Sequence, residues 1–411
     1  MKIKGWIMTQ LLKAATPDNA VFDSTEAAWL MLSHLPRMGV RRWHAVREHL
    51  ASPLELLEMN SATLRAMGLE ARTCEVIAAW QGRDAGHPEV AEVVTIRARC
   101  AAAGIGILPW DSPLYPEALS AIHDAPLVLY TRGDATLLQR SQIGIVGSRS
   151  ASRTGLEHAA QFAAALSERG YLVTSGLALG VDGAAHAGAL DAGFPTIAVI
   201  GTGVDVVYPR QHQALTERIA DEGLMVSELP PGTPARAAHF PQRNRIISGL
   251  SRGVLVVEAS PRSGSLITAR LALEQGREVF AIPGSIHNPQ ARGCHQLIRQ
   301  GATLVETVAD IEEELSAWST TRPAVKPAVR RKPTPAKEVA AAVEPPLAGL
   351  VPAGLEAREI AVLEALGYDP ASTDVLCTAT GLPADELMQS LLLLEMEGLV
   401  DSAPGGYQRL A

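Results

Sequence analysis

The chain has 411 residues, of which 47% are apolar and 4% aromatic, and its formal net charge is −8. A chain of this length holds two or three domains of ordinary size. No apolar run reaches the ~18 residues that cross a bilayer, and the four cysteines are too widely spaced for a zinc site or a disulfide framework. We therefore expect a cytoplasmic protein without a membrane anchor, a metal or a cofactor.

The negative charge is concentrated at the carboxyl end of the chain. Val351–Ala411 contains ten acidic and two basic residues, so it accounts for the whole net charge. The other 350 residues balance 34 acidic against 34 basic side chains. Net charge therefore does not exclude nucleic acid as a ligand, and local clusters of arginine decide the question.

Residues 1–100 are expected to form a small all-α domain of the SAM or helix-hairpin-helix type. Helical spacing of apolar residues begins near residue 24, and Leu35–Arg42 is typical of a turn between two helices. A glycine followed by paired arginines is found in helix-hairpin-helix modules that hold a DNA backbone. A helical bundle with a solvated basic corner explains the same residues, so both interpretations stay open.

Residues 104–316 alternate apolar strands with amphipathic helices, which predicts an α/β domain with a doubly wound, Rossmann-like parallel sheet. The expected strands are Ile105–Leu108, Leu127–Tyr130, Ile143–Val146, Leu172–Val173, Thr196–Ile200, Leu224–Ser227, Val254–Val257, Val279–Ala281 and Ala302–Leu304. The clearest helices are Gly155–Arg169, Gly183–Ala192, Gln211–Ala220 and Leu266–Gln275. Ligands of such a sheet bind beyond the carboxyl ends of its strands, where the strand order reverses.

Two further segments follow this domain. Residues 318–350 alternate proline and alanine with lysine and arginine, which is typical of an extended basic linker. Residues 351–411 have three helical patterns and a strand–turn–strand pattern, the outline of a winged helix. Its third helix contains acidic residues and no lysine or arginine, so it should repel DNA. Docking of a protein and a purely structural role remain the two interpretations.

Arginine, glycine and serine gather where the expected strands end. Gly147, Ser148 and Arg149 follow one strand, and Arg210 follows another in Tyr208–Arg210. Glycine lets the backbone approach a ligand, the serine hydroxyl can bond a phosphate oxygen, and arginine supplies a charged fork. These loops are therefore expected to bind an anion.

The densest such stretch is Phe240–Ser251, which precedes an apolar strand. It contains Arg243, Asn244 and Arg245, and Gly264 and Ser265 open the helix that follows that strand. Free backbone N–H groups at a helix start and nearby guanidiniums favour phosphate. The stretch contains no nucleophile–base pair and no set of metal ligands, so its residues indicate binding before catalysis.

Three patterns suggest an enzyme and need to be weighed. Gly201-x-Gly203 lacks the third glycine of a dinucleotide fingerprint, and the chain contains no Gly-Lys pair for an ordinary Walker ATP loop. Asp182 and His186 share one helix face as a potential acid–base pair, but such a histidine more often packs a helix. Glu258 at a strand end could act as a hydrolase acid, but the favoured interpretation is that it orients Arg243 or Arg245.

Together these motifs resemble the DprA/Smf family of bacterial DNA-processing proteins over about residues 108–315. The residues that carry the resemblance are Gly147-Ser148-Arg149, Ser175-Gly176, Asp182-Gly183-Ala184-Ala185-His186, Tyr208-Pro209, Phe240-Pro241, Arg243–Gly249, Ser263-Gly264-Ser265 and Pro283-Gly284. His212 and His295 depart from the pattern, because asparagine is expected at both positions in many members.

The resemblance implies a homodimer that binds single-stranded DNA and is not an enzyme. Such proteins protect incoming strands during natural transformation and load RecA recombinase while displacing single-strand-binding protein. By motif, the residues expected at the DNA are Gly147, Ser148, Arg149, Arg210, Phe240, Arg243, Asn244, Arg245, Gly264 and Ser265. In this set the arginines would hold phosphates, and the glycines and serines would supply N–H and hydroxyl donors. Phe240 would either stack on a base or pack as a core residue under the Pro241 turn.

The alternative function is a nucleotide-processing hydrolase of the phosphoribohydrolase kind on the same sheet. Such enzymes carry a Pro-Gly-Gly-x-Gly-Thr loop. In this chain Pro231-Gly232 continues as Thr233-Pro234, and Pro283-Gly284 continues as Ser285-Ile286, so the loop is missing.

Overall fold

The computed structural model describes residues 21–38, 42–43, 46, 49–321, 355–366, 370–403 and 406–410. The linker expected at 318–350 lies almost wholly outside these ranges, and so do residues 39–41 of the Leu35–Arg42 turn. In the part of the chain that is described, no helix has the length and apolar character that a bilayer crossing needs.

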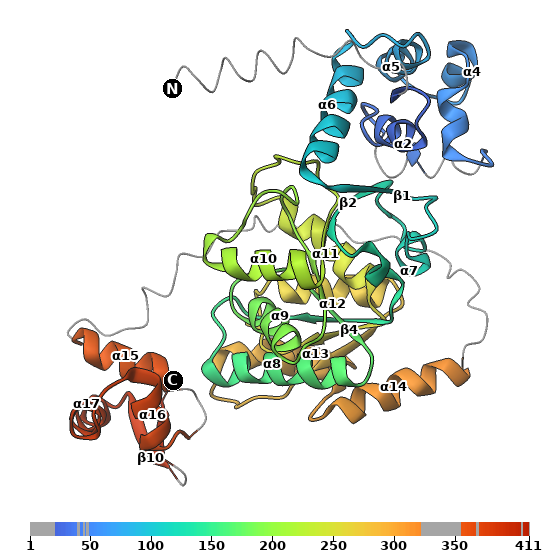
Figure 1. Ribbon diagram of the computed structural model, residues 1–411. Helices are drawn as coiled ribbons and strands as arrows, with labels where there is room; N and C mark the ends of the chain where they lie inside the picture. The colour runs from blue at the N-terminus through green and yellow to red at the C-terminus, as the bar shows by residue number, and fades with distance from the viewer. Residues whose placement is uncertain are drawn as a thin grey trace, which may run out of the picture.

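The centre of the molecule is a nine-stranded sheet in the order β1-β2-β6-β5-β4-β3-β7-β8-β9 (Figure 1). Its strands are β1 (Gly106–Pro109), β2 (Val128–Gly133), β3 (Gln142–Val146), β4 (Leu172–Ser175), β5 (Thr196–Val199), β6 (Leu224–Ser227), β7 (Gly253–Val256), β8 (Glu278–Ala281) and β9 (Thr303–Leu304). The run from β6 to β9 is parallel, which confirms the doubly wound, Rossmann-like prediction.

The predicted parallel pairing does not extend to the first two strands. β2 pairs antiparallel with both β1 and β6. The connection from β1 to β2 contains only the four-residue helix α7 (Glu117–Ser120) and no crossover helix of the kind that joins parallel neighbours. The apolar composition of these strands predicts burial and does not encode their direction.

Helices cover both faces of the sheet. One face carries α8 (Arg153–Glu168), α9 (Val181–Asp191) and α14 (Val308–Thr321), and the other carries α11 (His239–Leu250), α12 (Ser265–Glu274) and α13 (Arg292–Arg299). Successive residues of a strand point to opposite faces of the sheet. Leu255 of β7 packs with α8, α9 and α14, whereas Val254 and Val256 pack with α11, α12 and α13. The stretch around Arg243, to which the sequence assigned no element, is therefore a helix that packs on the sheet.

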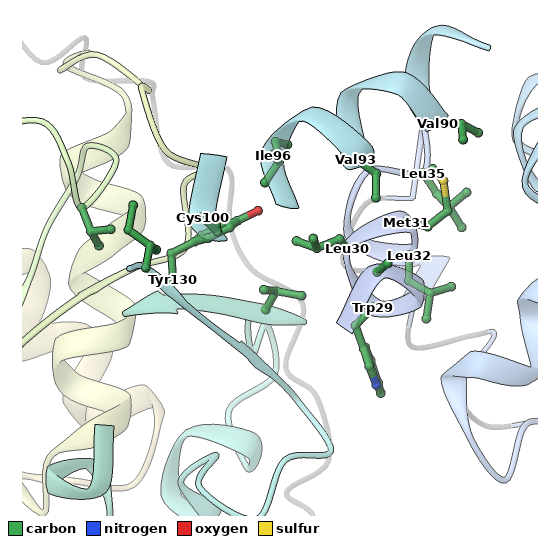
Figure 2. Packing of buried hydrophobic residues seen from close by; sticks show 14 of the residues in the cluster. Trp29, Leu30, Met31, Leu32, Leu35, Val90, Val93, Ile96, Cys100 and Tyr130 are labelled. Carbon is green, nitrogen blue, oxygen red and sulfur yellow. The ribbon is translucent and has the colours of Figure 1, made fainter. Parts of the chain in front are cut away.

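The amino-terminal helices share a core with the edge of the sheet. They are α2 (Thr25–Ser33), α4 (Ser61–Ala66), α5 (Ala71–Gln81) and α6 (Pro88–Ala103), with a short 3₁₀ helix η2 (Pro53–Leu57). Figure 2 shows Trp29 and Leu30 of α2, Ile96 and Cys100 of α6, and Tyr130 of β2 within one buried cluster. On the same cluster packs α10 (Gln213–Glu222), which follows the 3₁₀ helix η4 (Arg210–His212).

The carboxyl-terminal residues form the predicted winged helix. Its elements are α15 (Ala357–Ala365), α16 (Thr373–Thr380), α17 (Ala384–Met396) and the antiparallel pair β10 (Val400–Ala403) and β11 (Gly406–Arg409). The Ser372 side chain caps α16, and Gly381 ends it with a φ of 71° that favours glycine. Val362, Leu376 and Leu391 are fully buried in a core of this unit's own.

Leu30→Ala is expected to destabilise the protein by about 2–5 kcal/mol, because it opens a cavity in the cluster shared by α2, α6 and β2. Urea denaturation followed by circular dichroism measures the change. Leu156→Ala on α8 is the control, since Leu156 is exposed at the surface. Equal unfolding midpoints for Leu30→Ala and the unmodified protein would show that the two parts do not share a core.

Candidate nucleic-acid interface

The sheet order reverses next to β3, and the loops that leave β3, β4 and β5 converge on a cavity of about 80 Å³. Arg149 enters the cavity from the loop after β3, Gly176–Leu179 from the loop after β4, and Ile200–Thr202 from the loop after β5. Tyr208 and Pro209, together with Phe240 and Arg243 of α11, complete the lining. The cavity thus lies at the carboxyl edge of the strands, where a doubly wound sheet binds its ligands.

The base of the cavity is formed by the buried guanidinium of Arg243. Its Nη2 donates a hydrogen bond of 2.7 Å to the carbonyl oxygen of Gly176, and its Nε has no hydrogen-bond partner among the described residues. A Cβ at position 176 would lie 1.6 Å from Nη1, so the guanidinium occupies the space of the missing side chain. Burial lowers the pKa of Arg243 to about 10, which leaves it charged at neutral pH.

Asp182 holds the loop after β4, which contains Gly176, from the side opposite Arg243. Its buried carboxylate accepts hydrogen bonds from the backbone N–H groups of Gly176 at 3.1 Å and Ala178 at 3.4 Å. Burial raises the pKa of Asp182, while the charge of Arg243 and the two backbone bonds act in the opposite direction. Leu177 between them has a φ of 56°, a costly conformation for a residue with a side chain, which this packing maintains.

Two aromatic rings and a second arginine form the rim. The rings of Tyr208 and Phe240 lie 5.3 Å apart between centroids, and the guanidinium carbon of Arg149 lies 5.8 Å from the centre of the Phe240 ring. Tyr208 is 44% exposed, and Arg149 is exposed with no carboxylate partner in the described part of the chain. Cation and rings are therefore both accessible to a ligand from solvent.

The structure brings together three of the predicted residues, Arg149, Phe240 and Arg243. Arg210 is exposed and directly follows Pro209, which lines the cavity, so its charge lies near the rim. Tyr208 and Gly176 are site residues that the predicted set omitted. The signal for Tyr208 was present, because it stands two residues before Arg210 and beside a proline.

The predicted glycines and serines lie outside the cavity lining. A Cβ at Gly147 would meet Val181 at 2.6 Å, so this glycine permits helix packing. The Ser148 hydroxyl is buried and accepts from the backbone N–H of Ser150 at 3.1 Å. Gly264 and Ser265 begin α12, where the Gly264 carbonyl accepts from the Asn244 amide at 3.5 Å. Their expected contacts with phosphate remain predictions.

Arg245 lies in a different environment from Arg243. Its Nε pairs with Asp124 at 2.9 Å and its Nη2 pairs with Glu228 at 2.6 Å. The two carboxylates raise the pKa of Arg245 against the opposing effect of burial. The structure thus places Arg245 in an internal ion-pair network and away from the cavity lining.

The interpretation of Glu258 as a residue that orients Arg243 or Arg245 is wrong. Its carboxylate accepts from the backbone N–H of Ser152 at 2.8 Å, from the Ser152 hydroxyl at 2.6 Å and from the Asn288 amide at 3.0 Å. Glu258 therefore ties the start of α8 to the loop after β8. The hydrolase hypothesis requires Glu258 as an acid. In the structure its carboxylate instead accepts these three hydrogen bonds and links two loops.

His186 is a packing residue of α9. It is fully buried, and its Nδ1–H donates to the Thr196 hydroxyl at 2.8 Å, while that hydroxyl donates to the Val173 carbonyl. Burial lowers the pKa of His186 to about 3, and His212 and Arg243 add to the effect. No hydrogen bond joins it to Asp182 among the described residues, so the two do not form an acid–base pair.

The two histidines that depart from the family pattern each hold a loop carbonyl. His212 donates from Nδ1 to the carbonyl of Leu177 at 3.1 Å, and His295 donates from Nε2 to that of Gly284 at 3.0 Å. An asparagine amide can donate the same kind of bond. His212 therefore supports the loop at the base of the cavity.

The fold and the cavity define a Rossmann-like α/β protein with two arginines at the carboxyl edge of its strands and an attached winged helix. A family model described as DNA recombination-mediator protein A matches residues 106–316, and one described as the DprA winged helix domain matches residues 344–406. The first match covers just over half of the chain. The chain belongs to the DprA/Smf family of DNA-processing proteins.

Individual relatives agree with this assignment. Protein Smf of Escherichia coli is 42% identical over 308 residues, which is 74% of this chain and 77% of that protein. DNA processing protein DprA of Bacillus subtilis is 46% identical over 213 residues, 52% of this chain and 72% of that protein. The X-ray structure of DprA from Streptococcus pneumoniae aligns with a TM-score of 0.58 at 35% identity and covers 72% of this chain and 97% of that one.

Gly176→Ala is expected to displace the Arg243 guanidinium and to destabilise the protein by about 1–3 kcal/mol, because the new methyl group overlaps it. Urea denaturation measures the loss. Gly264→Ala is the control, since a Cβ there meets nothing within 4 Å. Equal stability of the two variants would contradict the close contact between Gly176 and Arg243.

As the pH falls below 6.5, the buried His186 is expected to lower the free energy of unfolding. Its pKa is lowered in the folded state, so its contribution is fully present above pH 6.5 and is lost as pH falls toward 3. His186→Gln should reduce the pH dependence of the free energy of unfolding by up to about 1.4 kcal/mol per pH unit. Denaturation between pH 6.5 and 5, where ordinary carboxyl groups stay ionised, measures the slope. An unchanged slope, equal to that of a His295→Gln control, contradicts the assignment.

Proposed function

We propose that this protein binds single-stranded DNA, without sequence preference and without catalysis, at the cavity beyond β3, β4 and β5. The observation that carries the proposal is the exposed Arg149 beside the Phe240 and Tyr208 rings, above the buried Arg243. Aromatic faces stack on unpaired bases, and guanidiniums bind the backbone phosphates.

Arg243 supports an anionic ligand in a further way. Its side chain lines the cavity and keeps its positive charge at neutral pH. A phosphate oxygen in the cavity would therefore meet a guanidinium whose position is already fixed by its bond to Gly176. Arg149 and Arg210 add exposed charge at the rim, so backbone phosphates on either side of a held base have cations within the same region.

A single strand fits the site better than a duplex. Stacking on Phe240 or Tyr208 needs a base whose face is free, and a paired base has none to offer. The acidic α17 contains no lysine or arginine that could contact the phosphates of a DNA duplex.

The wider role we propose follows the family. The matched description is that of a recombination mediator, and the relatives are called DNA-processing proteins. We propose that the protein acts in the cytoplasm as a homodimer, protects incoming strands during transformation or recombination, and loads RecA recombinase while single-strand-binding protein is displaced. In this scheme the cavity is the strand-holding site.

Arg149→Ala and Phe240→Ala are expected to weaken the binding of oligonucleotides of any sequence. Loss of one stacked base costs about 1–3 kcal/mol, and each lost phosphate contact should flatten the salt dependence by about 0.7. Fluorescence anisotropy with labelled oligothymidine and mixed-sequence strands at two salt concentrations measures both effects.

The matched control is Arg169→Ala. Arg169 is exposed at the carboxyl end of α8, at the opposite edge of the sheet, and pairs with Glu312. The Arg169→Ala variant should bind oligonucleotides with the same affinity and salt dependence as the unmodified protein. If all three variants kept the unmodified affinity and salt slope, the cavity would not be the strand-holding site.

A further inference from the structure

Helix α17 of the winged helix has an apolar face that none of the described residues covers. Its inner face, with Leu387, Leu391 and Leu394, is buried in the core of the unit. The apolar stripe on the outside consists of Met388 (44% exposed), Leu392 (60%), Leu393 (48%) and Met396 (78%). Met388, Leu392 and Met396 follow one another at every fourth position, so they lie along one side of the helix. A contiguous patch of this kind marks a docking surface.

Carboxylates without partners flank the apolar stripe. Asp385, Glu395 and Glu397 are exposed and make no ion pair within the described residues, whereas Glu386 lies 3.8 Å from Arg358. Helix α17 contains no lysine or arginine. A nucleic acid would be repelled, and a second copy of the same stripe would bring carboxylates against carboxylates. The matching occupant is apolar and positively charged.

We propose that the apolar stripe docks the chain's own amino-terminal segment, residues 1–13. This segment has large apolar residues at helical spacing, Ile3, Ile7 and Leu11, together with Trp6, Met8 and Leu12. It contains Lys2, Lys4 and Lys13 and no acidic residue, and the first carboxylate of the chain is that of Asp18. The segment therefore complements the stripe in both apolar surface and charge.

Residues 322–354, which lie between α14 and the winged helix and contain most of the basic linker, are the other part of the chain with suitable charge. Their composition fits less well. Residues 322–354 contain lysine, arginine, proline and alanine but no phenylalanine, tryptophan, methionine or isoleucine, so they offer little to cover Leu392 and Met396. These 33 residues are long enough to let the two ends of the chain meet. Fully extended, a chain of this length spans roughly 110 Å, so it does not prevent the winged helix from reaching the amino-terminal segment.

The test uses the full chain with a photo-reactive side chain at Gln389, which is exposed beside the apolar stripe and leaves it intact. After irradiation, mass spectrometry locates the adducts. Adducts within residues 1–13 are expected. The double variant Leu392→Ser, Met396→Ser should lower their yield about fivefold. Leu273→Ser is the matched control, because Leu273 on α12 is 56% exposed, close to the 60% of Leu392, and its change should leave the yield as it was.

Charge reversal separates docking from a fault in folding. Lys4→Glu with Lys13→Glu should lower the yield about threefold, and adding Asp385→Lys with Glu395→Lys should restore it. Adducts confined to residues 322–354, to α17 of a second copy or to no part of the chain would overturn the proposal, as would a yield unchanged by the stripe variant. Oligonucleotide binding by the cavity is measured separately and does not depend on this result.

Discussion

A buried guanidinium held against a glycine is the contact on which the rest of the candidate site depends. Arg243 reaches from α11 on one face of the sheet to the Gly176 carbonyl at the end of β4. Asp182, at the start of α9 on the other face, holds the N–H groups of the same loop. The loop is thus fixed from both layers. The Asp182 carboxylate also offsets part of the free-energy cost of burying the Arg243 guanidinium.

In the proposed function, the two arginines of the cavity have different roles. Arg243 is buried and its geometry is fixed before any ligand arrives, so little ordering remains to be done on binding. Arg149 is exposed beside the Phe240 ring and can follow the path of a flexible strand. A fixed cation below and an adaptable cation above suit a polymer whose backbone repeats while its bases vary.

The sequence was a good guide to the strands and a partial guide to the site. All nine strands could be located, and seven of them lie in the interior of the sheet, where buried strands are short, almost continuous apolar runs. Arg245 was grouped with Arg243 because the two are close in sequence. On a helix, however, residues i and i+2 point in directions about 200° apart, so Asp124 and Glu228 pair with Arg245 while Arg243 faces the cavity. Without recognising α11 as a helix, that separation was not predictable.

The two flanking units differ in how far they can be separated from the sheet. The winged helix closes its own core around Leu376 and Leu391, so it behaves as a module that recombination between genes can add or remove. The amino-terminal helices have no such independence, because Trp29 and Leu30 share their core with Tyr130 of β2. Excising them would expose the apolar side chains of the sheet that they cover, a surface prone to aggregation, so inheritance should keep these helices and the sheet together.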